Sequence, residues 1–233
     1  MLILAFETSA KAGSVALVQD GTLLAESYCN TGLTHSQTII PMAEDLLTRC
    51  GYTPKDVQAV AVAAGPGSFT GVRIGVAAAK GFAWGGQIPC YGVSTLHAMA
   101  LGLGIFDGYV LSAMDARREQ VYTALFHAEK GKLTRCTEDR AISLQELGEE
   151  IKNLSEPVFL VGDGSILCYN TLKELQPGLV LMPEHCMHQR ATGVGLAAME
   201  QIAAGDIGDG AALAPNYLRL SQAERERLAR EQK

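Results

Sequence analysis

Residues 65–81, GPGSFTGVRIGVAAAKG, form the stretch that decides the fold of this 233-residue chain. The segment before it, 57–63, is apolar apart from one glutamine and is typical of a fully buried strand. Glycine and proline at 65–67 predict a turn, and the small residues from 69 to 81 predict a helix. A buried strand that leads through a short turn into a helix is the repeating unit of α/β proteins. The stretch therefore predicts an α/β fold.

The elements on either side of this stretch occur in the same order twice. In the first half, strands are predicted at 2–6, 13–19 and 22–28, followed by a helix at 34–49, the strand–turn–helix above and a strand at 90–93. In the second half, strands are predicted at 109–114, 121–127 and 132–137, followed by a helix at 143–152, strands at 158–161 and 179–181, and a helix at 192–203. This repetition predicts two lobes, residues 1–106 and 107–220, with a charged tail at 221–233. A single mixed sheet is the alternative.

Composition and charge describe an ordinary globular chain. Hydrophobic residues make up 48% and charged residues 19%, which excludes a disordered, collagen-like or coiled-coil protein. The 19 Lys and Arg against 25 Asp and Glu give a net charge of −6, so any contact with RNA phosphates needs a local basic patch or a partner. The six cysteines form no Cys-x-x-Cys pair, and no apolar run reaches the ~20 residues that span a bilayer. We expect a cytoplasmic protein without a membrane partner.

Small residues line one face of the helix predicted at 69–81. Gly71, Gly75 and Ala79 are spaced by four residues, so they lie on one side of the helix and let another backbone come close. Two interpretations are open: this face packs on the protein's own sheet, or it receives a helix of another subunit.

The charges of the same region favour the second interpretation. No Asp or Glu occurs from residue 57 to residue 106, whereas Arg73 and Lys80 lie seven residues apart on the helix. A surface that carries cations and no acids suits an acidic partner. The sequence thus favours a protein-binding face on this helix.

Motifs of the common enzyme classes are absent from the sequence. The 65–81 stretch departs from both the Walker A and the dinucleotide-binding patterns, so it is a weak signal for nucleotide binding. The sequence contains neither a G-x-S-x-G elbow nor an H-E-x-x-H segment. His35, near the start of a predicted helix, is interpreted as a cap or a surface contact.

Two acids end matching strands of the two halves. Glu7 follows the first predicted strand of the first half, and Asp115 follows the first strand of the second half. Carboxylates in such places can hold Mg²⁺ or orient a water molecule across a cleft between lobes. Arg117, two residues after Asp115, favours instead a structural ion pair or a contact with a partner.

Five segments of the chain carry a family resemblance. They are ILAFETS at 3–9, the 65–81 stretch, GVSTL at 92–96, DARREQVY at 115–122 and PNYLR at 215–219. Together, in this order and over nearly the whole chain, they resemble the TsaB (YeaZ) family, the bacterial subunit of the machinery that makes N6-threonylcarbamoyladenosine (t6A) in tRNA. The resemblance implies the actin-like ATPase (sugar kinase/heat-shock) fold, with two RNase H-like lobes whose mixed sheets are flanked by helices.

The catalytic relative TsaD shares this fold, and the resemblance implies that its reaction centre is missing here. TsaD binds a metal through two histidines of an H-x-x-x-H segment and a later aspartate, and it binds nucleotide at a glycine-rich turn. The corresponding residues are Thr95, Met99 and Ala191 for the metal, and Ala113-Met114-Asp115 for the turn. A metal site needs several correctly placed ligands at once. The resemblance therefore implies no catalytic, cofactor or metal residues in this chain, with ATP and metal held by partner subunits.

The function implied by the resemblance is that of a non-catalytic scaffold or activator. Such a subunit pairs with TsaD and with TsaE for t6A modification of the adenosine next to the anticodon in tRNAs that read codons beginning with A. It contacts tRNA indirectly through the complex and forms a homodimer when alone. The alternatives are a weak ATP-binding protein or ATPase of the same fold, and a peptidase.

The family's pairing surface, its first two helices, corresponds here to 34–49 and 69–81. The residues that we expect at the partner interface are His35, Thr38, Met42, Gly71, Arg73, Gly75, Ala79 and Lys80. Candidate contacts to a third subunit or to a degenerate cleft are Glu7, Asp115 and Arg117.

Overall fold

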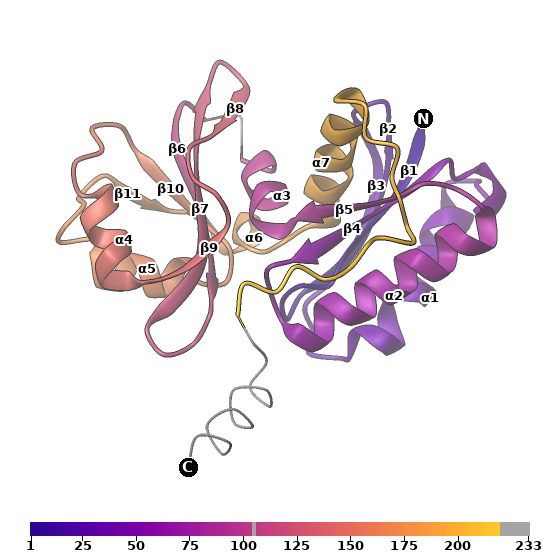
Figure 1. Cartoon of the computed structure of the whole chain (residues 1–233), viewed down its shortest axis with the longest axis horizontal. Coiled ribbons are helices and arrows are strands. Elements are labelled where there is room, and N and C mark those ends of the chain that lie inside the picture. Colours follow the sequence, from indigo (N-terminus) through magenta and orange to yellow (C-terminus); the bar gives the residue numbers. More distant parts are fainter. Residues whose placement is uncertain (104–105, 220–233) are drawn as a thin grey trace, which may run out of the picture.

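The computed structural model, which describes residues 1–103 and 106–219, consists of two lobes that are each built on one mixed sheet (Figure 1). The first sheet has the strand order β3-β2-β1-β4-β5. The second has the order β11-β10-β6-β7-β8, with β9 paired to β7. The predicted α/β fold with two mixed sheets flanked by helices is confirmed, and the single-sheet alternative is wrong.

The first lobe begins with an antiparallel meander and continues with parallel strands. Its strands are β1 (Leu2–Glu7), β2 (Gly13–Gln19), β3 (Thr22–Cys29), β4 (Ala59–Gly65) and β5 (Cys90–Ser94). Its helices are α1 (His35–Arg49), the 3₁₀ turn η1 (Pro54–Asp56), α2 (Phe69–Gly86) and α3 (Thr95–Leu101). Strands β1 and β4 are buried along their whole length because helices cover both faces of this sheet, which explains their nearly continuous apolar sequences.

The second lobe repeats this order with an added strand and with shorter helices. Its strands are β6 (Gly108–Asp115), β7 (Gln120–Glu129), β8 (Lys132–Arg135), β9 (Arg140–Ser143), β10 (Val158–Val161) and β11 (Leu179–Leu181). Its helices are α4 (Leu144–Ile151), α5 (Ser165–Leu172) and the single turn α6 (Glu184–Met187). The hydroxyl of Ser143 caps α4 and the Glu146 side chain returns to the Ser143 backbone, which is the capping box that a Ser-x-x-Glu pattern forms.

The last helix, α7 (Ala191–Ala203), packs on the first sheet and not on the second. Its Val194 and Ala198 belong to one buried cluster with Ile3 and Ala5 of β1. The Ser14 hydroxyl of β2 accepts a hydrogen bond from the backbone N–H at the start of α7, at 2.7 Å. The boundaries predicted for the second lobe, 107–220, are therefore wrong from the start of α7 onward. The tail predicted at 221–233 lies outside the described residues.

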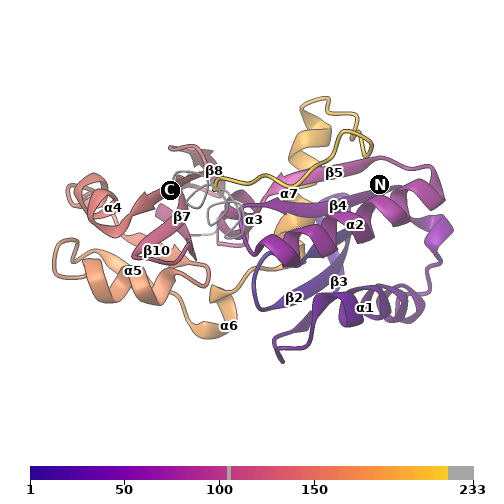
Figure 2. The same ribbon diagram turned by 60° about the horizontal axis from the view of Figure 1, so that its bottom comes forward.

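Helices lie on both faces of the first sheet, as the turned view shows (Figure 2). On one face, α1 and α2 pack over apolar side chains such as Leu4 and Phe6. On the other face, α7 covers the alternate residues of the same strands. Because successive strand residues point to opposite faces, each short apolar strand contributes buried side chains to both helix-covered faces of the sheet. No described helix has the length and apolar character needed to cross a membrane.

Candidate functional site

The small-residue face of α2 lies inside the protein. Gly71, Gly75 and Ala79 are buried, and Ala79 has no exposed surface. A Cβ atom at Gly71 would overlap the carbonyl oxygen of Thr8, and one at Gly75 would overlap the Thr8 hydroxyl. The expectation that these three residues receive a foreign helix is wrong, because the turn after β1 already occupies the space beside them.

The opposite side of α2 is open. At Gly81 and Gly85 an added Cβ would meet no atom within 4 Å. Trp84, the only tryptophan of the chain, has 87% of its surface exposed, and Ile40 of α1 has 39% exposed. A groove of about 550 Å³ runs between α1 and the second half of α2, lined by side chains that include Ile40, Leu47, Phe82 and Ile88. We call this surface the α1–α2 face.

The three interface residues predicted on α1 lie at its first turns. His35 is half-buried, and its Nε2 lies 2.7 Å from the carbonyl oxygen of Ala10, so it fastens α1 to the loop after β1. Thr38 and Met42 are half-buried, and Met42 packs against the core. Sequence reasoning missed Trp84, although the only tryptophan of the chain, in a segment of mostly small residues, was a usable signal.

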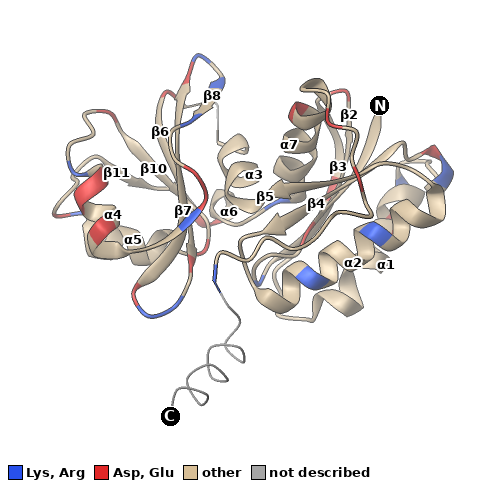
Figure 3. Cartoon of the chain, in the orientation of Figure 1, with Lys and Arg blue, Asp and Glu red and all other residues tan. Residues whose placement is uncertain are grey.

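Arg73 and Lys80 hold a segment of the chain itself. Residues 204–219, which we call the C-terminal strap, run back from α7 along the first lobe to the space between the lobes (Figure 1). The Lys80 ammonium donates to the carbonyl oxygens of Leu213 at 2.9 Å and Ala211 at 3.2 Å, and Arg73 Nε donates to the Tyr217 hydroxyl at 2.6 Å. Figure 3 shows basic residues and no acidic ones along α2. Lys80 lies beside Trp84 at the edge of the α1–α2 face, whereas Arg73 lies nearer the start of α2, and both side chains form hydrogen bonds to the strap.

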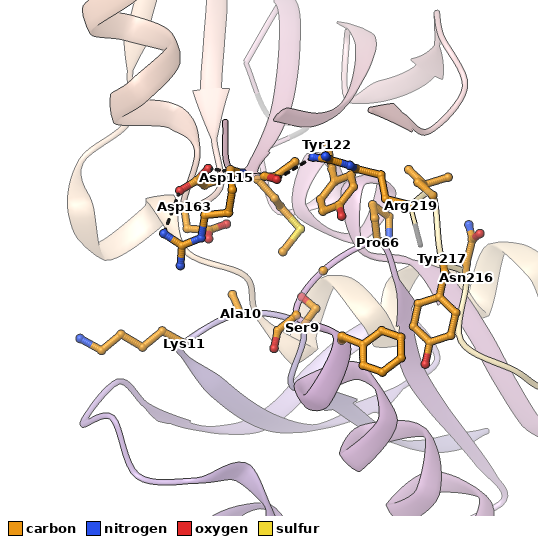
Figure 4. A pocket seen from close by; sticks show the side chains of 17 residues that line it. Ser9, Ala10, Lys11, Pro66, Asp115, Tyr122, Asp163, Asn216, Tyr217 and Arg219 are labelled. Carbon is orange, nitrogen blue, oxygen red and sulfur yellow. Dashed lines mark hydrogen bonds and ion pairs between the residues drawn. The ribbon is translucent and has the colours of Figure 1, made fainter. Parts of the chain in front are cut away.

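A cleft of about 520 Å³ lies between the lobes (Figure 4). One wall comes from the second lobe with Asp115 and Asp163, and the facing wall comes from the first lobe with Ser9 and Lys11. A third side is formed by the strap, with the side chains of Asn216, Tyr217 and Arg219. Asp115 and Arg117 were predicted from the sequence as cleft residues, whereas Asp163 and the strap residues were not.

Glu7 lies fully buried at the end of β1. The Ser9 backbone N–H donates to Glu7 Oε1 at 2.6 Å, and Oε2 has no hydrogen-bond partner among the described residues. Burial raises the pKa of Glu7 to about 7, and the nearby Asp163 contributes in the same direction. A carboxyl group without exposed surface cannot touch a third subunit, so that part of the expectation for Glu7 is wrong.

Asp163 carries a second carboxyl group; the residue is exposed to solvent at the wall of the cleft, while its carboxyl is partly desolvated by the atoms around it. Burial raises its pKa, even though Gln189 Nε2 donates a hydrogen bond to Oδ1 at 2.8 Å. No group of three or more His, Cys, Asp and Glu side chains is placed to hold a metal ion within 1–103 and 106–219. Thr95, Met99 and Ala191, which stand at the metal-ligand positions of TsaD by resemblance, are all buried where α3 packs beside α7.

The turn between β6 and β7 carries Arg117. Arg117, Arg118 and Glu119 all have left-handed backbone conformations, with φ of 65°, 57° and 57°. Asp115 accepts a hydrogen bond from the Arg117 N–H at 2.7 Å, and its other oxygen lies 3.6 Å from the Arg117 guanidinium. The Arg117 side chain is 87% exposed, so it is available to an anionic group at the mouth of the cleft.

Sequence and structure comparisons identify this arrangement. YeaZ from Pseudomonas aeruginosa matches with a TM-score of 0.74 and 28% identity, over 93% of this chain and 99% of that one. Two lobes of mixed sheet and helix that enclose a cleft define the actin-like class of proteins, and this chain is a member of it.

Sequence relatives then give the family. The protein named "tRNA threonylcarbamoyladenosine biosynthesis protein TsaB" from Bacillus subtilis is 35% identical, over 96% of each chain. Its Escherichia coli namesake is 40% identical, over 78% of this chain and 82% of that one. A family model described as TsaD, tRNA N6-adenosine threonylcarbamoyltransferase, matches residues 30–226. The chain belongs to the TsaB (YeaZ) family.

Proposed function

We propose that this chain is an accessory subunit of t6A biosynthesis that does no chemistry itself. In this proposal it pairs with a TsaD-type subunit, and TsaE joins the pair with ATP to modify the adenosine beside the anticodon in tRNAs that read codons beginning with A. The tRNA is contacted through the complex, and ATP and metal are held by the partners. The names of its relatives support a place in this biosynthesis.

The proposal rests on the exposed apolar character of the α1–α2 face. An exposed tryptophan beside an apolar groove resembles the core of a protein interface, where large aromatic anchors supply most of the binding energy. We propose that the partner contacts Ile40, Gly81, Trp84 and Gly85, with Thr38 and Arg73 nearer its rim. The same face would join two copies when the partner is absent.

A reconstituted reaction tests the proposal. A TsaD-type subunit, TsaE, tRNA, ATP and a preformed activated threonylcarbamoyl donor are combined with and without this chain, and t6A is measured by mass spectrometry of digested tRNA. We expect product only when the chain is present, and none from the chain alone. Equal product without the chain, or product from the chain alone, would contradict the accessory role.

The alternative, weak binding or hydrolysis of ATP, would use the cleft between the lobes. Its walls carry Lys11, Arg117 and Arg219, which suit phosphate oxygens, and also two carboxyl groups, which repel them. Calorimetric titration of the isolated chain with Mg-ATP distinguishes the two functions. Binding with micromolar affinity together with phosphate release would favour the alternative.

A further inference from the structure

The C-terminal strap is bonded to β4 and β5, the last two strands of the first sheet. The backbone N–H of Cys90 in β5 donates to the carbonyl oxygen of Gly208 at 3.1 Å, and the N–H of Asn216 donates to that of Ala64 in β4 at 2.6 Å. These backbone bonds, together with those from Lys80, fix the path of the strap over the first lobe. The strap is therefore a defined part of the fold, although it contains no regular element.

Near its end the strap is gripped by the first turns of α2. The Tyr217 ring stacks on Phe69 with centroids 4.7 Å apart, and its hydroxyl accepts the hydrogen bond from Arg73. The Arg73 guanidinium lies 3.8 Å from the centre of the Phe69 ring, so one cation holds both aromatic rings. Two residues further on, the strap reaches the second lobe.

The contact with the second lobe is made by Arg219. Its Nη1 donates to the carbonyl oxygen of Ala116 at 2.8 Å, directly before the left-handed residues 117–119. Left-handed backbone is unfavourable for residues other than glycine, so three such residues in a row need contacts that hold them. The Ala116 N–H, bonded to the Gln120 carbonyl oxygen at 3.0 Å, closes the turn from inside, and Arg219 holds it from outside.

The lobes are joined separately through α3. The Ser94 hydroxyl, which caps α3, donates to Asp139 at 2.5 Å, and the Ser112 hydroxyl of β6 donates to the carbonyl oxygen of Leu96 at 2.8 Å. These contacts lie away from the cleft, whose lining includes no residue of α3. The lobes thus meet at α3, and the strap crosses between them at the cleft.

We propose that the strap is a latch across this cleft: Arg219 holds the 116–120 turn to the first lobe, and Tyr217, anchored by Phe69 and Arg73, positions Arg219. The latch begins on the helix that forms the proposed partner surface. Tyr217 is 40% exposed and Arg73 is exposed, so a subunit lying along α2 reaches the anchor. One further step rests on the proposed function. When a partner subunit occupies the α1–α2 face, the strength with which Arg219 holds the 116–120 turn changes.

Hydrogen–deuterium exchange of the isolated chain tests the latch without any partner. In Arg219→Met the Ala116 and Gln120 amides should exchange about tenfold faster, as expected for the loss of one hydrogen bond, while the Asn216 amide is unchanged. In Tyr217→Ala all three amides should exchange faster, and Tyr217→Phe, which keeps the ring, should show a smaller change of the same kind. Arg118→Met, in the same turn, is the matched control and should change none of them.

Protection of the β1 amides shows that each variant is folded. If the Ala116 and Gln120 amides keep their wild-type exchange rates in folded Arg219→Met and Tyr217→Ala, the latch is overturned. The strap would then be only a local cover of the first sheet.

A second arm adds a TsaD-type subunit. Its binding should change exchange at Ala116 and Gln120 in the wild type, and Arg219→Met should bind it without that response. An equal response in Arg219→Met overturns the coupling. If neither the wild type nor any variant binds the subunit, the proposed function is contradicted. The exchange rates of the isolated chain still decide whether the latch exists.

Discussion

The hydroxyl of Thr8 donates a hydrogen bond to the carbonyl oxygen of Gly71 at 2.8 Å, and both residues are buried. This contact joins the turn after β1 to the first turn of α2. It explains why the helix has small residues on this side: the turn needs the space that side chains would fill. The close neighbour that the spacing of Gly71, Gly75 and Ala79 predicts is real, but it belongs to the same chain.

Enlarging this face should therefore destabilise the fold. We expect Gly75→Leu to lower the free energy of unfolding by about 3 kcal/mol, because the new side chain meets the Thr8 hydroxyl and Val62 in a filled core. Gly81→Ala, on the open side of the same helix, is the control and should raise it by up to about 1 kcal/mol. Urea unfolding followed by circular dichroism measures both. A Gly75→Leu protein as stable as the wild type would contradict the assignment of this face to the core.

Trp84→Ala should weaken partner binding and leave folding unchanged. A side chain that is 87% exposed contributes little to the core, whereas tryptophan anchors in interfaces are worth about 2 kcal/mol or more. We expect the dissociation constant for a TsaD-type subunit to rise at least about tenfold, measured by calorimetry. Leu23→Ala, at an exposed position of the β3 edge strand, should leave the affinity unchanged. Unaltered affinity in Trp84→Ala would move the interface away from this end of α2.

Glu7→Gln should stabilise the protein increasingly as the pH rises. The folded state keeps the Glu7 proton up to about pH 7, whereas the unfolded chain releases it near the usual pKa of 4.5 for a glutamate. The folded state thus binds more protons across this window, and Glu7 lowers stability progressively as the pH increases through it. The gain from glutamine should be small at pH 4 and about 3 kcal/mol at pH 8. Urea unfolding at both values measures it, and a gain independent of pH would show that Glu7 does not titrate in this window.

Asp139→Asn should loosen the junction between the lobes. Asp139 accepts the Ser94 hydroxyl and pairs with the Arg135 guanidinium at 2.7 Å, so its replacement weakens two contacts in a half-buried place. We expect a loss of about 1–3 kcal/mol in the free energy of unfolding. Glu138→Gln, at the exposed neighbouring position, should change it by less than about 0.5 kcal/mol. Equal losses in both variants would indicate a general charge effect and not the specific contacts.

Most of the strands and their order along the chain could be predicted because they leave a local mark in the sequence. Apolar runs mark β1 and β4, and the Asp20-Gly21 pair marks the hairpin between β2 and β3. Strand β9 was missed because its four half-buried residues carry no periodic pattern, and its place is set by pairing with β7. Helix α2 runs five residues past the predicted end because Gly81 faces solvent and does not terminate it.

Long-range relationships could not be predicted from local patterns. The apolar face of α7 shows that the helix packs on a sheet, but it does not show which of the two sheets. In the same way, the spacing of small residues on α2 requires a close neighbour without identifying it. The cleft depends on both of these long-range relationships, the packing of α7 and the neighbour of α2. Its third side is the strap, which follows α7 in the chain. In the sequence, only Glu7, Asp115 and Arg117 indicated where the cleft would be.

The placement of α7 on the first sheet has a consequence for synthesis on the ribosome. Residues 1–94 supply all five strands of that sheet, but the layer over one of its faces emerges only after another hundred residues have been made. Until then, the nascent first lobe presents Ile3, Ala5 and Val18 on an uncovered apolar surface. The second lobe is completed at α6, before that surface is covered. The half of the molecule that is translated first is thus the last to finish folding.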